Sequence, residues 1–308
     1  MILCDQLMYT SYFAPRGRER LYSLGQQLSE RYLTPMDLLI GIVGDAGAGK
    51  SSVVKGMFPG LELTNDDDGV NVRPLPLLKN IDHDFFSAHT YHVDVRFELA
   101  FTQRYELADA VKKAIAHGKR VIVEHFDLLY PALGMNADVL VGVGGEVILV
   151  KPTIFGPEPK ELVDIVTTTL RYRKMAHTAE DLTTQTLLRE YNIPMPIGHR
   201  DVYRGFVMEY PTPIELDLRE VEGKVLDAIR QDRPVCYQDE NHIRIGEDIW
   251  SCTGPRTHVN STGKIENFRL VRECKYDRKS KTYLLIGLVG PESEILDGLA
   301  ALNNAVKF

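Results

Sequence analysis

The sequence predicts an α/β fold in which a parallel sheet carries helices on both faces, followed by a smaller α+β domain. Between residues 37 and 150, short apolar runs alternate with segments of helical periodicity, as in a parallel sheet whose strands are joined by helices. Three prolines and a glycine within residues 152–159 then indicate a linker. We therefore expect an N-terminal helical arm over residues 1–36, a first domain over residues 37–160 and a second over residues 161–308.

Composition limits the class of protein. The chain has 308 residues, of which 44% are hydrophobic and 26% charged, as expected for a soluble globular protein of one large or two ordinary domains. Its net charge of −7 argues against a protein that coats nucleic acid non-specifically. The four cysteines lie far apart without CxxC pairing, and no apolar run approaches the ~20 residues of a membrane span. We expect a reduced, cytoplasmic protein that does not enter the membrane. The sequence does not indicate its oligomeric state.

A glycine-rich stretch follows the apolar run of residues 38–43. Residues 44–51 read GDAGAGKS and match the phosphate-binding pattern GxxxxGKS, in which backbone amides surround phosphate oxygens. In this pattern Lys50 neutralises the β- and γ-phosphates and Ser51 holds Mg²⁺. We expect ATP and Mg²⁺ to bind here, because the chain lacks the NKxD sequence that reads guanine. The expected nucleotide-binding residues are Gly44, Asp45, Ala46, Gly47, Ala48, Gly49, Lys50, Ser51 and Ser52.

Acidic residues follow two predicted strands. Asp66, Asp67 and Asp68 come after a short strand at residues 61–64, where carboxylates would face the ligand crevice of an α/β sheet. They are candidates for a general base or for ligands of Mg²⁺-bound water, and an acidic turn is an equal alternative. Glu124 and Asp127 lie at the end of the strand predicted within residues 119–127, where either could orient Mg²⁺-bound water. A buried parallel strand followed by incidental acids is the alternative. The expected catalytic residues are Lys50, Asp66, Asp68 and Glu124.

Further elements are predicted from periodicity and local composition. Residues 14–33 and 95–117 have helical spacing, and residues 139–143 and 146–150 are strand-like. Residues 79–93 contain three histidines and are interpreted as a loop at an acceptor site.

The first half resembles P-loop kinases of the uridine kinase and phosphoribulokinase type. The likeness rests on residues 44–51, on the acids Asp66 to Asp68 and on the strand GKRVIVEHFD, and it covers about 130 residues. In that family the acid after the second strand acts as base on the acceptor hydroxyl. The resemblance therefore implies phosphoryl transfer to an acceptor that the sequence does not identify.

The second half carries two separated motifs. A long helical stretch over residues 161–191, with an interruption left open near residues 174–181, contains HTAEDL at residues 177–182. Residues 252–265 contain Cys252, then THV, then TG and a final isoleucine. Together they resemble the second additional domain of alanyl-tRNA synthetase and the related threonyl editing domain, over residues 166–290. In that family two helix histidines with a distant Cys and His bind Zn²⁺, and the site hydrolyses an amino acid wrongly attached to tRNA.

The resemblance carries over to His177, Cys252 and His258, with two departures. The second helix ligand is Asp181 in place of histidine, and Asp181 lies four residues after His177 on the same helix face. Cys252 and His258 are six residues apart instead of four. The implied metal ligands are His177, Asp181, Cys252 and His258, with Zn²⁺ as the metal. A retained fold with an inactive or altered metal site is the alternative.

Three functions remain open from the sequence. The first is an ATP-dependent phosphotransferase or NTPase whose second domain recognises an amino acid, a nucleotide or an aminoacyl-tRNA end. The second is a zinc-dependent aminoacyl-tRNA deacylase with a regulatory nucleotide domain. The third is a non-catalytic binding module whose affinity for a partner is switched by nucleotide.

Overall fold

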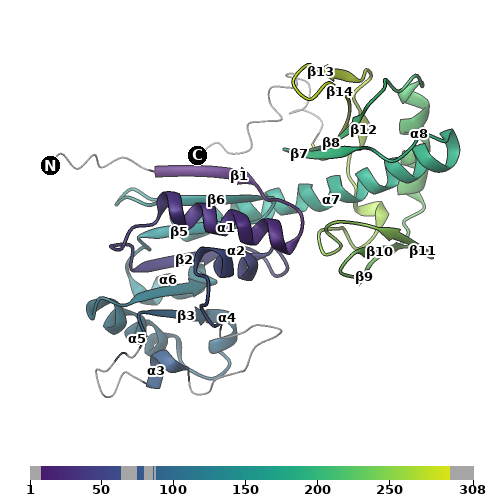
Figure 1. Cartoon of the computed structure of the whole chain (residues 1–308). Helices are drawn as coiled ribbons and strands as arrows, with labels where there is room; N and C mark the ends of the chain where they lie inside the picture. Colours follow the sequence, from purple (N-terminus) through teal and green to yellow (C-terminus); the bar gives the residue numbers. More distant parts are fainter. Residues whose placement is uncertain (1–7, 64–74, 80–85, 87, 292–308) are drawn as a thin grey trace. The chain divides into compact units, whose positions relative to one another are not determined.

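The computed structural model describes residues 8–63, 75–79, 86 and 88–291. The chain divides into two compact units, one ending at Thr167 and one beginning at Thr168 (Figure 1). The division falls inside helix α7 (Pro159–Tyr191), whereas the sequence placed it between residues 160 and 161. Residues 8–36, assigned from the sequence to an N-terminal arm, belong to the first unit.

The first unit is built on a six-stranded mixed sheet in the order β1-β6-β5-β2-β4-β3. Four neighbouring strands are parallel: β5 (Val139–Val143), β2 (Leu39–Val43), β4 (Arg120–Glu124) and β3 (Thr90–Asp94). Strand β6 (Glu146–Lys151) runs antiparallel to β5, and β1 (Met8–Phe13) runs antiparallel to β6. Only Gly144 and Gly145 connect β5 to β6, which is too short for the crossover that a parallel pair requires. The prediction of a wholly parallel sheet was therefore wrong.

The strand predictions were partly confirmed. Strands β2, β4, β5 and β6 lie where the apolar runs predicted them. Residues 61–63 form no strand, and residue 64 lies outside the described residues. Strand β3 overlaps the end of the stretch interpreted as an acceptor loop, and β1 was not predicted. Four of the five β3 residues are buried, so this strand lacks the alternation of a half-exposed strand.

The helices of the first unit follow most of the predicted periodicity. They are α1 (Arg18–Tyr32), α2 (Lys50–Met57), α3 (Pro76–Lys79), α4 (Val95–Glu98), α5 (Arg104–Ala116) and α6 (Phe126–Leu133). The single helix predicted over residues 95–117 is divided into α4 and α5. Gln103 and Glu106 form a capping box that begins α5, which explains the break.

Glycines allow the helices of the first unit to pack closely. Gly25 of α1 and Gly56 of α2 face each other's helix, and an added Cβ at Gly56 would overlap the carbonyl oxygen of Tyr22. On the sheet, a Cβ at Gly41 of β2 would meet Phe126 of α6, and a Cβ at Gly142 of β5 would meet α7. Helices α1 and α2 lie in front of the sheet in the view of Figure 1.

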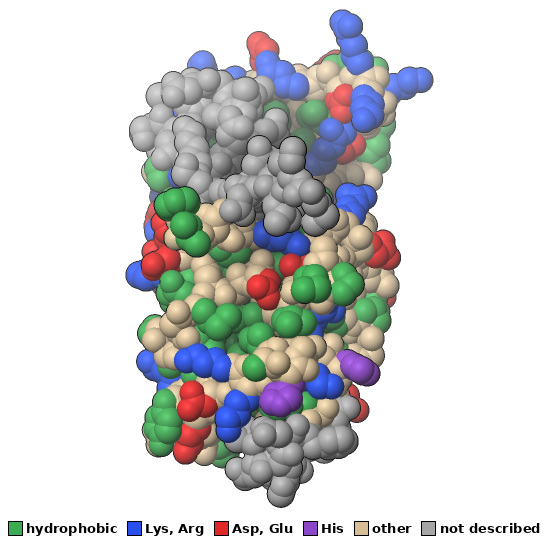
Figure 2. Space-filling view, turned by 90° about the vertical axis from the view of Figure 1, so that its left-hand side faces the viewer, with side chains coloured by type: hydrophobic (Ala, Val, Ile, Leu, Met, Phe, Trp, Pro, Cys, Tyr) green, Lys and Arg blue, Asp and Glu red, His purple; other side chains and the backbone are tan. Residues whose placement is uncertain are grey.

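The amino ends of β2 and β5 and the end of β6 form one edge of the sheet. Asp138 accepts hydrogen bonds from the backbone N–H groups of Leu38 and Leu39, both 2.8 Å, and Lys151 pairs with Asp37 at 2.7 Å. Near this edge Met36 is 80% exposed, and Ile154 and Phe155 are each 92% exposed. Figure 2 views the molecule from the side on which the chain enters β1, and apolar side chains are visible there among charged ones.

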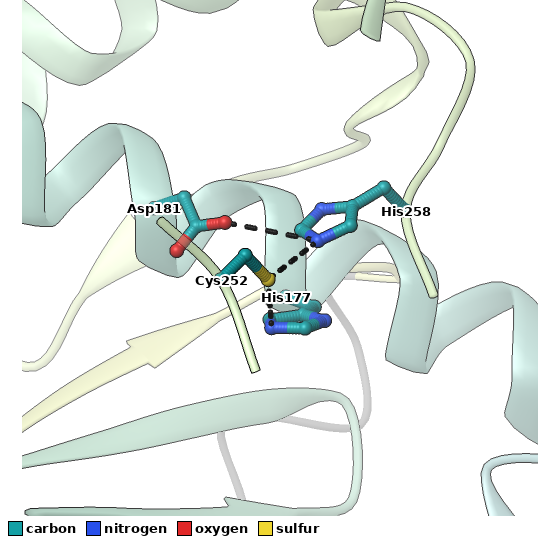
Figure 3. A group of neighbouring side chains, drawn as sticks. All are labelled: His177, Asp181, Cys252 and His258. Carbon is teal, nitrogen blue, oxygen red and sulfur yellow. Dashed lines mark hydrogen bonds and ion pairs between the residues drawn. The ribbon is translucent and has the colours of Figure 1, made fainter. Parts of the chain in front are cut away.

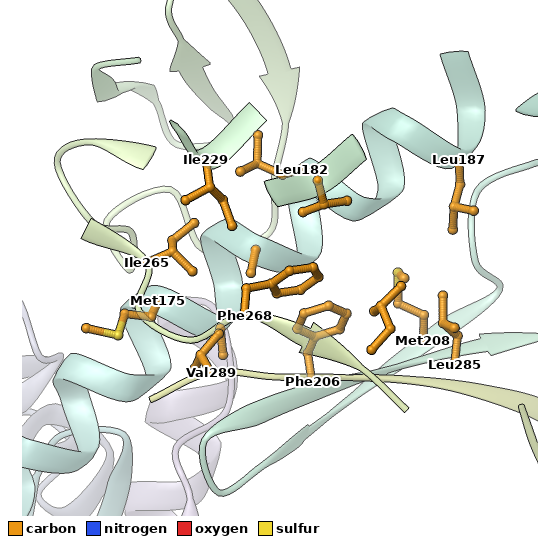
Figure 4. Close-up of a cluster of buried hydrophobic side chains, with 14 of the residues drawn as sticks. Met175, Leu182, Leu187, Phe206, Met208, Ile229, Ile265, Phe268, Leu285 and Val289 are labelled. Atoms are coloured by element: carbon orange, nitrogen blue, oxygen red, sulfur yellow. The ribbon is translucent and has the colours of Figure 1, made fainter. Parts of the chain in front are cut away.

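The second unit packs α7 and α8 (Leu218–Arg230) against antiparallel strands. One sheet has the order β12-β14-β8-β7, with β13 paired to β14, and a second has the order β11-β10-β9. The strands are β7 (Gly198–Val202), β8 (Gly205–Tyr210), β9 (Val235–Asp239), β10 (His242–Ile245), β11 (Asp248–Ser251), β12 (Arg269–Leu270), β13 (Lys275–Asp277) and β14 (Thr282–Leu288), with a 3₁₀ turn η1 (Thr262–Lys264). Figure 4 shows the core, in which Leu182 of α7, Ile229 of α8 and Phe206 of β8 converge.

Helix α7 is continuous through residues 174–181, so the interruption left open by the sequence does not occur. Its second half is unusually well buried, including polar residues from His177 to Thr186. Among the described residues, none of the helices combines the length and the hydrophobicity needed to cross a membrane.

Candidate functional site

The glycine-rich loop joins the carboxyl end of β2 to the first residue of α2. Gly44, Gly47 and Gly49 have φ angles of 137°, 76° and 98°, which side-chain-bearing residues rarely adopt. A Cβ at Gly44 would overlap the carbonyl oxygen of Val143, whereas Gly47 borders open space. The predicted strand–loop–helix arrangement of the phosphate-binding pattern is therefore present.

Lys50 begins α2 and is 6% exposed. Its Nζ donates a hydrogen bond of 3.0 Å to the carbonyl oxygen of Asp45 in its own loop. Burial lowers the pKa of Lys50, while the carboxylates of Glu124 and Asp94 oppose that shift and Arg96 adds to it. A buried cation therefore lies within the electrostatic reach of two carboxylates and a second cation.

Glu124 is the last residue of β4 and lies beside the strand that leads into the loop. It pairs in register with Ile42 of β2 on one side and with Asp94 of β3 on the other. Its Oε1 lies 3.1 Å from Nε2 of His92, and both side chains are buried. Asp94 accepts a hydrogen bond from the backbone N–H of Phe97 at 3.1 Å and so caps α4.

His125 follows Glu124 in a left-handed conformation with φ of 57°. Its side chain is buried, and burial lowers its pKa, with further lowering by Lys50 and Arg96. Left-handed residues other than glycine are uncommon and concentrate at ligand sites. The carboxyl ends of β2, β3 and β4 thus gather charged groups of both signs near the glycine-rich loop.

Only some of the charged residues at this edge of the sheet were predicted from the sequence. Asp66 and Asp68 lie outside the described residues, as does Asp67. Asp127 lies in the first turn of α6, and Ser51 and Ser52 lie in the first turn of α2. The sequence analysis missed Asp94, because β3 itself was not recognised. A pattern of buried strand followed by an acid and a helix start could have indicated it.

The second unit contains a compact group of four side chains that could hold a metal ion. One ligand atom from each of His177, Asp181, Cys252 and His258 lies within 4.8 Å of the others. Sγ of Cys252 is 3.4 Å from Nε2 of His177 and 3.2 Å from Nε2 of His258. Nε2 of His258 is 3.7 Å from Oδ2 of Asp181. Figure 3 shows the four side chains converging from α7 and from the loop after β11.

Hydrogen bonds outside this group fix both imidazole tautomers. Nδ1 of His177 lies 3.2 Å from the carbonyl oxygen of Thr257, which can only accept, so Nδ1 carries the proton. Thr178 donates its hydroxyl proton to the carbonyl oxygen of Lys174 at 2.9 Å. Its Oγ1 therefore accepts from Nδ1 of His258 at 3.2 Å. In the neutral rings both Nε2 lone pairs point toward Cys252, as metal ligation requires.

Asp181 and the six-residue separation of Cys252 and His258 are both compatible with a close group of four side chains. Asp181 projects from the same face of α7 as His177, and its carboxylate reaches His258. The longer loop contains a turn in which the N–H of Thr257 donates to the carbonyl oxygen of Gly254 at 2.9 Å. This turn lies between Cys252 and His258, and His258 lies within the group. The N–H of Gly254 also lies 3.4 Å from Sγ of Cys252.

Comparison with protein-family models and with curated proteins finds no match for this chain. The chemistry of each site is therefore argued from its own residues. Two imidazoles, a thiol and a carboxylate are a donor set that fits Zn²⁺, which prefers four N, S or O ligands in tetrahedral arrangement. The loop of the first unit offers backbone amides, a buried ammonium and nearby carboxylates, which fit a phosphate chain with Mg²⁺.

Proposed function

We propose that the first unit binds ATP with Mg²⁺ and acts as a kinase-like phosphotransferase or NTPase. We further propose that the second unit recognises an amino acid, a nucleotide or an aminoacyl-tRNA end. The observation that carries the first proposal is the placement of buried Lys50 at the start of α2, where the charges of Glu124 and Asp94 act on it. A buried lysine close to two acids and next to left-handed glycines fits a site for polyphosphate and a divalent cation.

Each residue has a separate role in this proposal. Loop amides from Gly44 to Ser51 bind the phosphate chain, and Lys50 neutralises the β- and γ-phosphates. The Ser51 hydroxyl would hold Mg²⁺, which supplies charge neutralisation for the transferred phosphoryl group. Glu124 would orient water bound to Mg²⁺, and Asp66 and Asp68 remain candidates for the base on the acceptor.

The test is nucleotide binding and turnover by a loop variant. Lys50→Ala should lose most affinity for ATP and all measurable phosphate release, because the phosphates lose their principal countercharge. Binding is measured by calorimetry and turnover by phosphate release. A Lys50→Ala protein that binds and hydrolyses ATP like the wild type would overturn the proposal.

A second candidate function is supported by the four-residue group of the second unit. The fixed tautomers of His177 and His258 favour Zn²⁺ ligation, and a zinc-dependent aminoacyl-tRNA deacylase would use such a site. Zinc would polarise the ester carbonyl or activate water when bound. Metal analysis of the purified protein and release of amino acid from Ser- or Gly-charged tRNA test it. A protein free of zinc that releases no amino acid would reject this function.

The same two tests distinguish a non-catalytic binding module from both enzymatic functions. If ATP and zinc both bind but neither reaction occurs, nucleotide-dependent binding of a partner becomes the function to measure.

A further inference from the structure

A histidine on β3 contacts the acid that the proposed function places at the nucleotide. Nε2 of His92 lies 3.1 Å from Oε1 of Glu124, and the two side chains are 1% and 6% exposed. His92 is aligned with Ile122 and Asp94 with Glu124, so His92 and Glu124 project from the same face of adjacent strands. The contact is therefore fixed by the register of the sheet.

We infer that His92 is a positioning residue for Glu124, holding its carboxylate in the orientation that binds Mg²⁺-coordinated water. The inference rests on the proposed function, because His92 acts only through Glu124. A glutamate side chain has several rotatable bonds, and a buried hydrogen bond to one oxygen restricts it to few rotamers. Partners of this kind orient the groups that ligate metals, and their loss typically reduces affinity 10- to 100-fold.

The location of the pair argues for this role over a purely structural one. Glu124 ends β4 beside Ile42, two residues before Gly44, at the carboxyl edge where α/β sheets bind ligands. Glu124 also pairs in register with Asp94, the acidic residue that ends β3 at the same edge. Burying two polar side chains costs desolvation that apolar residues in the same place would avoid, so the position of this pair at the ligand edge fits a site role.

The experiment compares three replacements of His92 in the full-length protein. His92→Gln keeps a nitrogen donor near the position of Nε2, His92→Leu removes it, and His92→Asn keeps polarity but withdraws the donor from reach. The dissociation constant of a non-hydrolysable ATP analogue is measured with and without Mg²⁺, and kcat and KM are measured for ATP. Glu124→Gln and the His92→Leu/Glu124→Gln double variant complete a cycle.

Mg²⁺ should raise the analogue affinity of His92→Leu and His92→Asn by a factor about ten times smaller than in the wild type. Their affinity for the analogue without Mg²⁺ should equal that of the wild type. For these variants kcat should also fall, and KM for ATP should rise together with the dissociation constant measured in Mg²⁺. His92→Gln should retain most of both properties. The double variant should be no weaker than Glu124→Gln alone, because His92 has no effect once its carboxylate is removed.

Four results would overturn the inference, of which three concern Mg²⁺ and the double variant. These are a full Mg²⁺ response in His92→Leu, an equal loss in His92→Gln and His92→Leu, or additive effects in the double variant. The fourth is a loss of analogue affinity in His92→Leu that is the same with and without Mg²⁺, which would indicate general damage to the site. Failure of the proposed function is distinct, because the wild type would then not bind the analogue or Lys50→Ala would bind it equally well.

Discussion

At the residue scale, the hydroxyl of Thr178 orients His258, a candidate metal ligand. It is fully buried and sits between Lys174, which accepts its proton, and His258, whose Nδ1 proton it accepts. The N–H of Val259 also donates to it at 3.2 Å. Thr178 therefore fixes both the tautomer of His258 and the backbone that follows it.

Removing this hydroxyl should weaken metal binding without unfolding the unit. Thr178→Val has nearly the same shape but cannot accept the Nδ1 proton, so we expect zinc affinity to fall about tenfold or more. Competition with a chromophoric chelator measures it. Thr183→Val is the matched control, because Thr183 is equally buried on α7 and its hydroxyl bonds to the carbonyl oxygen of Ala179. Equal affinities in the two variants would contradict this assignment.

Glu146, the first residue of β6, is a buried carboxyl in the first unit. Burial raises its pKa to about 7, with a hydrogen bond from Ser11 partly opposing the shift. The folded protein therefore binds a proton that the unfolded chain releases near its ordinary pKa of about 4.3. Its contribution to stability is highest below that value and is lost as pH rises through about 7.

Glu146→Gln should remove this pH dependence. We expect the variant to match the wild type near pH 4 and to exceed its unfolding free energy by roughly 3–4 kcal/mol at pH 8. Urea titrations at several pH values measure the difference. Exposed Glu19→Gln should leave the wild-type profile unchanged. If the unfolding free energy of Glu146→Gln changed with pH in parallel with that of the wild type, this carboxyl would not be the cause of the pH dependence.

At the element scale, glycines set how closely helices approach. Gly56 of α2 lies against the backbone of α1, where an added Cβ would overlap the carbonyl oxygen of Tyr22. Gly223 of α8 has no atom within 4 Å of the position of a Cβ. The same substitution at the two positions should therefore have opposite effects.

Gly56→Ala should destabilise the protein by about 1–3 kcal/mol, because α1 and α2 must separate. Gly223→Ala should stabilise it by about 0.5–1 kcal/mol, because alanine loses less backbone entropy in a helix. Chemical denaturation measures both, and a stabilising Gly56→Ala would show that the two helices are not in close contact. Gly56→Ala should also weaken ATP binding, since α2 carries Lys50 and Ser51.

At the scale of the whole molecule, each unit has its own candidate site and its own core. Lys50, Glu124 and Asp94 lie within the unit ending at Thr167, and the four metal-ligand candidates lie within the unit beginning at Thr168. Helix α7 is the one element that belongs to both units among the described residues. Loss of one site should therefore leave the chemistry of the other in place.

Reciprocal variants test this independence. Lys50→Ala should retain one zinc per chain, and Cys252→Ala should lose zinc but keep the ATP affinity of the wild type. Metal analysis and calorimetry on the same preparations measure both quantities. Loss of both properties in either single variant would show that the two sites depend on each other.

The local sequence was sufficient where a site is built from neighbouring residues. The loop of residues 44–51 lies between a strand and a helix as its pattern predicted, because glycine backbone freedom and the adjacent apolar run are local properties. The separation of His177 and Asp181 by four residues also placed them on one face of α7.

Only the tertiary structure decided which distant residues meet. Cys252 reaches His177 across 75 residues of sequence, and a turn within its loop returns His258 to the group. His92 contacts Glu124 because β3 pairs with β4 in one register, and no local signal specified that pairing. Burial and strand pairing depend on the whole sheet, whereas helix periodicity and glycine conformation depend on a few consecutive residues.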